Sequence, residues 1–158
     1  VRGQEFWSGG REGKQGEFQV GELLQVNAQM LEMFLSKGYV PVIAPVGMTE
    51  DGQSVPLDAD QVAAMVAREL KASKLVLLTG ATGLMVEDEL VQQMPTTLLE
   101  ANLKAGAFEG NLLAKAKVAL WAANAGVERV HVIDARTPHS VIAELFTDQG
   151  VGTLVTLG

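Results

Sequence analysis

Lys74-Leu75-Val76-Leu77-Leu78-Thr79-Gly80-Ala81-Thr82-Gly83 is the stretch that decides the fold. The apolar run inside residues 74–79 predicts a strand that is buried on both faces, as strands of parallel sheets are. Two glycines and two threonines follow directly, and glycine lets backbone N–H groups approach an anion without a Cβ in the way. On spacing alone a tight turn at the strand exit explains the loop better, because neither a GxGxxG nor a Walker pattern is present.

Helices and strands alternate on both sides of this strand. Apolar periodicity predicts further strands over 39–45, 129–134 and 151–157, helices over 28–37, 60–72, 95–104, 110–124 and 140–146, and a hairpin over 86–94. Strands that alternate with helices across short loops are typical of βαβ units around a parallel sheet. The sequence therefore predicts an α/β fold.

Residues 1–20 differ from the rest of the chain. Residues 8–16 are rich in glycine and charge, which predicts a loop or hairpin tip. A P-loop does not fit, because Ser8 and Gln15 stand where that motif needs glycine and Ser or Thr. We expect a hairpin or loop segment over 1–20 and a folded lobe over 21–158.

Composition excludes several functional classes. The 158 residues include 12 basic and 19 acidic side chains, a net charge of −7, which argues against nucleic acid as a main partner. The chain has no cysteine, so disulfides, thiolate metal sites and cysteine nucleophiles are excluded. No apolar run approaches the roughly 20 residues that a membrane span needs, and residues 1–5 lack the apolar segment of a signal peptide. We therefore expect no membrane partner and a cytoplasmic location.

Lys115 is the most informative charged residue. It lies near the start of the predicted helix 110–124, at the margin of the apolar stripe of Ala116, Ala119, Leu120 and Ala123. A cation there opposes the helix dipole, whereas the free N–H groups of a helix start attract phosphate. A bound anion would explain both the cation at the helix start and the free N–H groups there. A lysine that extends its ammonium group to water would explain the position of Lys115 equally well. Lys117 is expected to be an ordinary surface lysine.

Asp58 and Asp60 open the predicted helix 60–72, where acidic residues are ordinary stabilisers. Their functional alternative is to orient a lysine or a metal-bound phosphate. His131 and His139 are eight residues apart and have no metal-ligand spacing.

Several stretches together resemble the acetylglutamate kinases of the amino acid kinase family. They are residues 37–47, 50–54, 58–63, 74–79, 126–134 (Gly-Val-Glu-Arg-Val-His-Val-Ile-Asp) and 144–153 (Glu-Leu-Phe-Thr-Asp-Gln-Gly-Val-Gly-Thr). The resemblance covers residues from about 21 to the end and corresponds to the C-terminal, nucleotide-binding half of that family. It implies a three-layer sandwich around a parallel sheet, with a β-hairpin near the N-terminus.

The resemblance also implies an activity: transfer of the γ-phosphoryl group of ATP, which carries Mg²⁺, to the side-chain carboxylate of N-acetyl-L-glutamate in arginine biosynthesis. Lys115 corresponds to the lysine that contacts the transferring phosphoryl group, Asp60 to the aspartate that orders the active-site lysines, and Asp58 lies in the substrate motif. The implied nucleotide contacts are Thr79, Gly80, Ala81, Gly83, Leu84, Glu109, Gly110 and Asn111. A homo-oligomer is implied for a full-length enzyme.

Differences from the family pattern keep two alternatives open. Pro56 stands where the family has a substrate-binding asparagine, and Gly80 stands where it has an aspartate, which suits a non-catalytic module that senses a nucleotide or an amino acid. Kinases for carrier-linked aminoadipate or glutamate also carry an aspartate at the position of Asp58. The chain contains no Lys-x-Gly-Gly turn of the family's N-terminal half, so we expect it to be inactive alone.

Overall fold

The structure is a computed structural model and describes residues 23, 25–49, 52–146 and 150–158. The predicted loop or hairpin over 1–20 therefore lies outside the described residues. The chain forms two compact units, residues 1–66 and 67–158. The helices are α1 (Ala28–Ser36), α2 (Ala59–Glu69), α3 (Thr96–Lys104), α4 (Gly110–Asn124) and α5 (Ser140–Phe146). The strands are β1 (Val46–Met48), β2 (Ser54–Pro56), β3 (Lys74–Thr79), β4 (Met85–Val86), β5 (Glu89–Leu90), β6 (Gln93–Pro95), β7 (Arg129–Asp134) and β8 (Gly152–Thr156).

The second unit is built on a four-stranded sheet in the order β3-β7-β8-β6. β3 and β7 are parallel, as predicted, and β8 is also parallel to β6, a strand that was not predicted. The central pair, β7 and β8, is antiparallel, so the sheet is mixed and the prediction of a parallel sheet is wrong at this pairing. The apolar pattern of a strand reads the same in both directions, and sequence periodicity therefore could not reveal this reversal.

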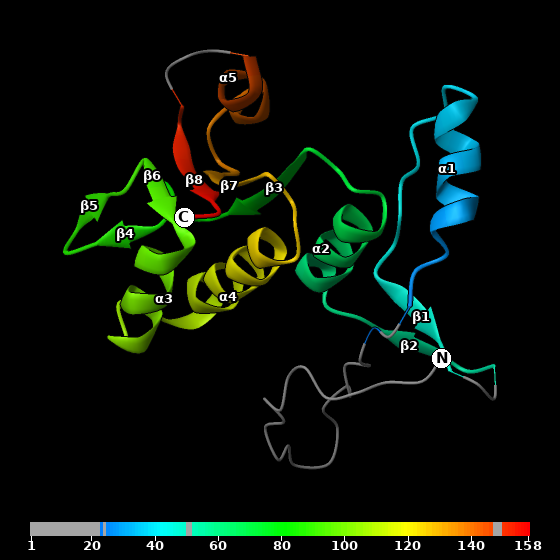
Figure 1. Cartoon of the computed structure of the whole chain (residues 1–158), viewed down its shortest axis with the longest axis horizontal. Coiled ribbons are helices and arrows are strands. Elements are labelled where there is room, and N and C mark those ends of the chain that lie inside the picture. The colour runs from blue at the N-terminus through cyan, green and yellow to red at the C-terminus, as the bar shows by residue number, and fades with distance from the viewer. Residues whose placement is uncertain (1–22, 24, 50–51, 147–149) are drawn as a thin grey trace. The chain divides into compact units, whose positions relative to one another are not determined.

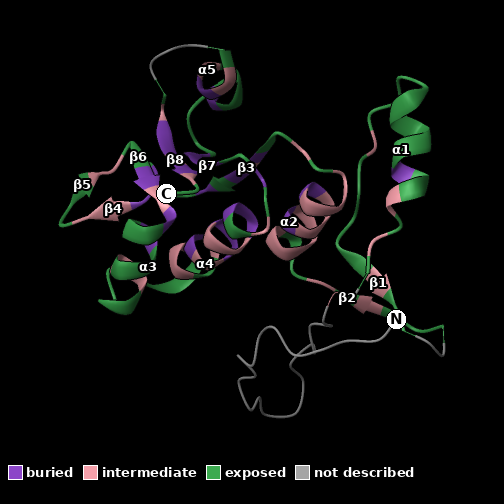
Figure 2. Ribbon diagram, viewed as in Figure 1, coloured by how far each residue is buried: buried purple, intermediate pink, exposed green. Residues whose placement is uncertain are grey.

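Helices cover both faces of the sheet (Figure 1). α3 and α4 lie on one face, where α4 packs on β3, β7 and β8, and α5 packs on β7 from the other face. Every residue of β7 after Arg129 is buried, because β7 has a strand on each side and a helix on each face. The buried residues concentrate in this sheet and in α4 (Figure 2).

β3 is exposed on one face, contrary to the prediction that both of its faces are buried. Leu77 is 2% exposed, whereas its neighbour Leu78 is 46% exposed. Among the described residues β3 pairs only with β7, and α4 covers the face that carries Leu75 and Leu77. Apolar side chains on both faces of β3 therefore do not mean that other elements pack on both faces.

α4 has the predicted bounds, and its packing depends on small side chains. Its buried residues are Ala116, Val118, Ala119, Ala122 and Ala123. Alanine has no side chain beyond Cβ, so the helix axis can approach the sheet closely. Leu120, predicted for this stripe, is only half-buried.

Two other elements differ from their predicted bounds. α2 ends at Glu69, and it buries Ala64 and Ala67 rather than the Val62, Val66 and Leu70 face that its periodicity favoured. The hairpin predicted over 86–94 is the shorter β4–β5 pair, because Gln93–Pro95 leave it and form β6 of the main sheet.

The first unit contains α1 and the antiparallel pair of β1 and β2. The strand predicted over 39–45 is not formed, and Val42 in this segment is 96% exposed. A strand is stabilised by a neighbour, and no described residue forms a ladder with 39–45. The predicted turn at 50–53 lies between β1 and β2; Gly52 has a φ of +83°, and residues 50 and 51 lie outside the described residues.

Candidate functional site

The carboxyl ends of β3 and β7 lie side by side. The last register pair of these parallel strands is Thr79 with Asp134, and the Ala135 N–H donates to the Thr79 carbonyl at 2.8 Å. The loop after β3 and the loop after β7 therefore leave the same edge of the sheet. In open α/β sheets this edge is where ligands bind.

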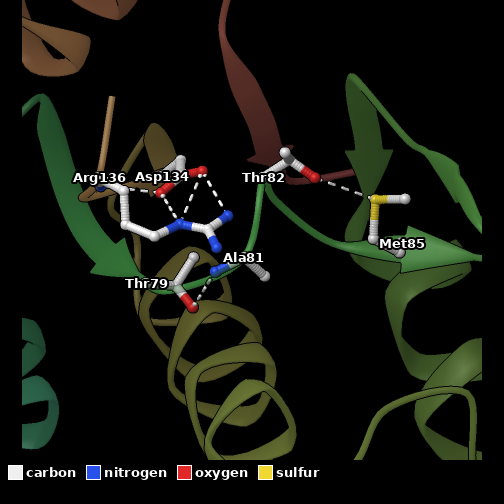
Figure 3. Close-up of polar contacts among 6 residues, drawn as sticks. All are labelled: Thr79, Ala81, Thr82, Met85, Asp134 and Arg136. Atoms are coloured by element: carbon white, nitrogen blue, oxygen red, sulfur yellow. Dashed lines mark hydrogen bonds and ion pairs between the residues drawn. The ribbon is translucent and has the colours of Figure 1, made fainter. Parts of the chain in front are cut away.

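The loop after β3 begins with an open segment (Figure 3). Thr79 is buried, and its Oγ1 accepts a 3.4 Å hydrogen bond from the Ala81 N–H, which closes a small turn. Gly80 is exposed, and a Cβ built on it would meet nothing within 4 Å. Thr82 is also exposed and donates to the Met85 sulfur. The backbone at Gly80 is therefore accessible to a ligand.

The end of the same loop is closed by packing. The Leu84 N–H donates to Thr153 Oγ1 at 2.8 Å, and Leu84 is 0% exposed. A Cβ on Gly83 would lie 2.6 Å from Leu90 Cδ1 and 2.8 Å from Thr153 Oγ1. Glycine at position 83 is therefore a packing requirement. Of the predicted loop contacts, Gly80 is exposed and Ala81 is half-buried, whereas Thr79, Gly83 and Leu84 are buried.

The start of α4 reaches the same level of the sheet. α4 packs on β3 and β7, and a short turn after Asn124 returns the chain to Arg129, so α4 runs antiparallel to β7. The 15 residues of α4 span about 22 Å, and the 6 residues of β7 span about 20 Å. Because the two lengths are similar, the start of α4 lies near the carboxyl end of β7. The predicted ligands Glu109, Gly110 and Asn111 are exposed at this helix start, and the Glu109 side chain makes no capping hydrogen bond.

Lys115 lies in the second turn of α4 and is half-buried. Lys117 is half-buried as well, so exposure does not separate the two lysines as the sequence suggested. The catalytic role of Lys115 stays a prediction, now with a defined place near the carboxyl edge of the sheet.

Asp134 and Arg136, to which the sequence assigned no role, form an ion pair at the same edge. The Asp134 carboxylate accepts hydrogen bonds from the Arg136 backbone N–H (2.8 Å), Nε (2.9 Å) and Nη2 (2.8 Å). The Arg136 bonds hold the pKa of Asp134 at about 2, below its ordinary 3.8, and raise the pKa of Arg136. Asp134 is therefore a carboxylate at neutral pH. In the sequence, the signal for this ion pair is a predicted strand that ends at Asp134 and is followed two residues later by Arg136.

Asp58 and Asp60 lie in the first unit, at the start of α2. The Asp58 Oδ1 accepts a hydrogen bond from the Gln61 N–H at 2.9 Å, so Asp58 caps this helix. Asp60 is in the first turn and half-buried. The helix-stabilising interpretation holds for Asp58, and the substrate and ordering roles of both residues stay predictions.

His131 is buried in β7, and its Nδ1 lies 2.8 Å from Glu144 Oε1 of α5. Glu144 also accepts a hydrogen bond from the Val151 N–H at 2.6 Å. Within the part of the chain that the structure describes, no group of three or more His, Asp or Glu could hold a metal ion. In the same residues no helix has the length and apolarity to cross a membrane.

Comparisons with known proteins agree with this arrangement. Curated relatives include acetylglutamate kinases of Stutzerimonas stutzeri, 45% identical over 138 residues, and of Syntrophomonas wolfei, 42% identical over 140. These matches cover 87% and 86% of this chain but 46% and 49% of those proteins, so the chain spans about half the length of the curated relatives it matches.

Solved structures show a similar fold. N-acetylglutamate synthase from Neisseria gonorrhoeae, complexed with coenzyme A and L-arginine, has a TM-score of 0.84 and 27% identity, with 96% of this chain and 35% of that chain covered. Carbamate kinase from Giardia lamblia, bound to AMP-PNP, has a TM-score of 0.67 at 16% identity, with 84% and 45% covered, and shows the fold alone. The model of the amino acid kinase family matches residues 6–134. The chain belongs to the amino acid kinase family.

Proposed function

We propose that this chain is the nucleotide-binding half of an acetylglutamate kinase. The single observation that carries the proposal is the co-linear match to acetylglutamate kinases at 42–45% identity over most of the chain. The accessible loop at Gly80–Thr82 and the uncapped start of α4, both at the carboxyl edge of the sheet, support it.

The proposed reaction is transfer of the γ-phosphoryl group of ATP to the side-chain carboxylate of N-acetyl-L-glutamate. Phosphoryl transfer depends on positioning and charge neutralisation more than on covalent help from the protein. Backbone N–H groups of the loop and of the α4 start would hold the phosphates, and Lys115 would neutralise charge on the transferring group. Asp60 would order the active-site lysines and Asp58 would contact the acyl amino acid. Mg²⁺ would arrive with the nucleotide.

A kinase of this type would work in the cytoplasm, and we propose a homo-oligomer for a full-length enzyme. The isolated 158-residue chain is expected not to turn over acetylglutamate, because it carries no Lys-x-Gly-Gly turn. A coupled ADP-release assay with ATP and N-acetyl-L-glutamate measures this directly.

ATP binding tests the proposal on the chain itself. Calorimetric titration should detect ATP binding to the wild type, and Lys115→Ala should weaken it about tenfold or more, because a hydrogen bond to a charged group contributes about 1.5–3 kcal/mol. Lys117→Ala is the matched control, since it removes a half-buried lysine two residues away on the same helix. Equal affinities of wild type and Lys115→Ala for ATP would remove Lys115 from the site.

One observation favours a second candidate, a non-catalytic module that senses an amino acid. The N-acetylglutamate synthase whose structure covers 96% of this chain is complexed with L-arginine, and it is not named a kinase. A chain that binds L-arginine but not ATP in the same titrations would support this candidate over the kinase. A panel of acyl amino acids and carrier-linked substrates, offered to a chain joined to an N-terminal lobe, would separate the acetylglutamate acceptor from aminoadipate or glutamate on a carrier.

A further inference from the structure

The ion pair of Asp134 and Arg136 lies beside the start of the loop that the proposed function assigns to the nucleotide. Asp134 is the register partner of Thr79, and the Ala135 N–H donates to the Thr79 carbonyl at 2.8 Å. Asp134 and Arg136, which flank Ala135, therefore lie next to the loop that continues into Gly80 and Ala81.

Asp134 holds the Arg136 guanidinium in one orientation. The carboxylate accepts from Nε at 2.9 Å and from Nη2 at 2.8 Å, a two-point contact, and its Oδ1 also accepts from the Arg136 backbone N–H. A guanidinium is planar, so two contacts along one side fix the direction of its remaining N–H groups. The contact along the Nε side leaves the far end of the fork, with N–H groups of Nη1 and Nη2, for another acceptor.

The two partners differ in exposure. The Asp134 side chain is 9% exposed, whereas the Arg136 side chain is 67% exposed. The guanidinium lies mostly in solvent, where an ion pair is screened, so stability alone gives a weak reason for this arrangement. An arginine held in one orientation and presented to solvent is, by contrast, well suited to bind a planar or tetrahedral oxyanion.

The loop that begins beside the pair is exposed at Gly80. A Cβ built on Gly80 would meet nothing within 4 Å, so the space next to the loop backbone is open. In Figure 3 the guanidinium lies between the Asp134 carboxylate and the Thr79–Ala81 turn, with its unbonded nitrogen toward Ala81. We expect an oxyanion at this edge to contact both the exposed loop backbone and the oriented arginine.

We propose that Arg136, oriented by Asp134, binds a phosphate group of the nucleotide at the carboxyl edge of β3 and β7. This inference rests on the proposed nucleotide function and adds to it a ligand-binding residue, Arg136, and a positioning residue, Asp134. The contact recognises phosphate oxygens, and it therefore distinguishes a nucleoside triphosphate from a nucleoside.

The test is calorimetric titration of the full chain with ATP and with adenosine. Arg136→Ala should weaken ATP binding about tenfold or more and leave adenosine affinity within about twofold. Asp134→Asn should weaken ATP binding less, because the arginine remains but its orienting charge is lost, and it should also spare adenosine. A merely structural role of Asp134 would lower both affinities together.

Arg129→Ala is the matched control, since Arg129 is an exposed arginine at the amino end of the same strand, on the opposite edge of the sheet. Its ATP affinity should match that of the wild type. Arg136→Lys keeps the positive charge but loses the fork, so it should also weaken ATP binding, and it carries the test if the alanine variant does not fold.

Three results would overturn the proposal. Equal ATP affinity in wild type and Arg136→Ala excludes the contact while the nucleotide function stands. Equal losses for ATP and adenosine exclude phosphate as the group that is recognised. A wild-type chain that binds no ATP refutes the nucleotide function itself, and the arginine contact with it.

Discussion

Gly152→Ala should destabilise the second unit strongly, because β8 lies against its antiparallel neighbour β7 without space for a side chain at this position. An ideal Cβ on residue 152 would lie 2.4 Å from the Val132 carbonyl oxygen, 2.6 Å from Ile133 Cγ2 and 3.0 Å from Ile133 Cα. Carbon–oxygen contacts between strands are ordinarily about 3.3–3.6 Å. The first strand residue of β8 would therefore have to move about 1 Å away from the backbone of β7.

The magnitude follows from two costs. Overpacking of a closely packed site costs about 1–3 kcal/mol, and loss of a ladder hydrogen bond near the Ile133–Gly152 register pair costs about 0.5–1.5 kcal/mol. A total of about 3 kcal/mol corresponds to a fall of about 6–12 °C in Tm for a chain of this size. Thermal unfolding followed by far-ultraviolet circular dichroism measures this difference.

Gly80→Ala is the matched control for this prediction. The same substitution at residue 80 places its Cβ in open space and meets no positive φ. It should leave Tm within about 2 °C of the wild type, or raise it slightly through the lower entropy of the unfolded chain. Equal melting temperatures for Gly152→Ala and Gly80→Ala would refute the reasoning from close approach.

Three further predictions concern stability. Glu144→Ala leaves the Val151 N–H and buried His131 without their acceptor, so it should cost about 1–3 kcal/mol of stability for each orphaned group. The control Glu128→Ala removes an exposed carboxylate and should leave the midpoint of urea unfolding unchanged. Similar urea midpoints in both variants would contradict this prediction. The Asp134 pKa is about 2 in the folded chain and 3.8 ordinarily. Its contribution to stability is therefore present above pH 4 and is lost as pH falls toward 2. Arg136→Ala should consequently lose less Tm than the wild type between pH 5 and pH 2, and parallel acid limbs would argue against the pair. Asp88→Gly should stabilise the β4–β5 hairpin by about 0.5–1 kcal/mol, because Asp88 has a φ of +63° in a position that favours glycine; a lower Tm for this variant would count against it.

The elements that sequence predicted best are those whose pattern and burial coincide. β3 and β7 were predicted with the bounds that the structure has, because each is a short apolar run between clear turn signals. α4 has its predicted bounds as well, since Gly110 and Gly126 frame it. In these segments local preference and tertiary packing require the same structure.

Predictions failed where the neighbours decided the outcome. The segment 39–45 has the composition of a strand, but a strand also needs a ladder partner, and the described residues provide none. Leu78 in β3 is apolar yet 46% exposed. The residue type alone does not show whether another element covers that face of the strand. The direction of β8 depends on how the chain returns after α5, which hydrophobic periodicity does not record.

The candidate site shows the same division between local pattern and three-dimensional context. The Thr79–Gly83 loop could be singled out from its residues, because glycine after a buried strand has few common explanations. The ion pair of Asp134 and Arg136 could not be predicted, since their spacing does not show that the parallel register places Asp134 beside Thr79.

The residues proposed for nucleotide binding and those proposed for acceptor chemistry lie in different parts of the chain, and this separates their tests. The loop after β3, the start of α4 and the Asp134–Arg136 pair all belong to residues 67–158, whereas Asp58 and Asp60 belong to residues 1–66. An ATP affinity therefore tests the proposed site at the carboxyl edge of one sheet and depends on no assumption about the acceptor. If Lys115→Ala and Arg136→Ala each weaken ATP binding while Asp58→Ala does not, the nucleotide site is assigned to the second unit. If Asp58→Ala weakens ATP binding as much as they do, that assignment is wrong.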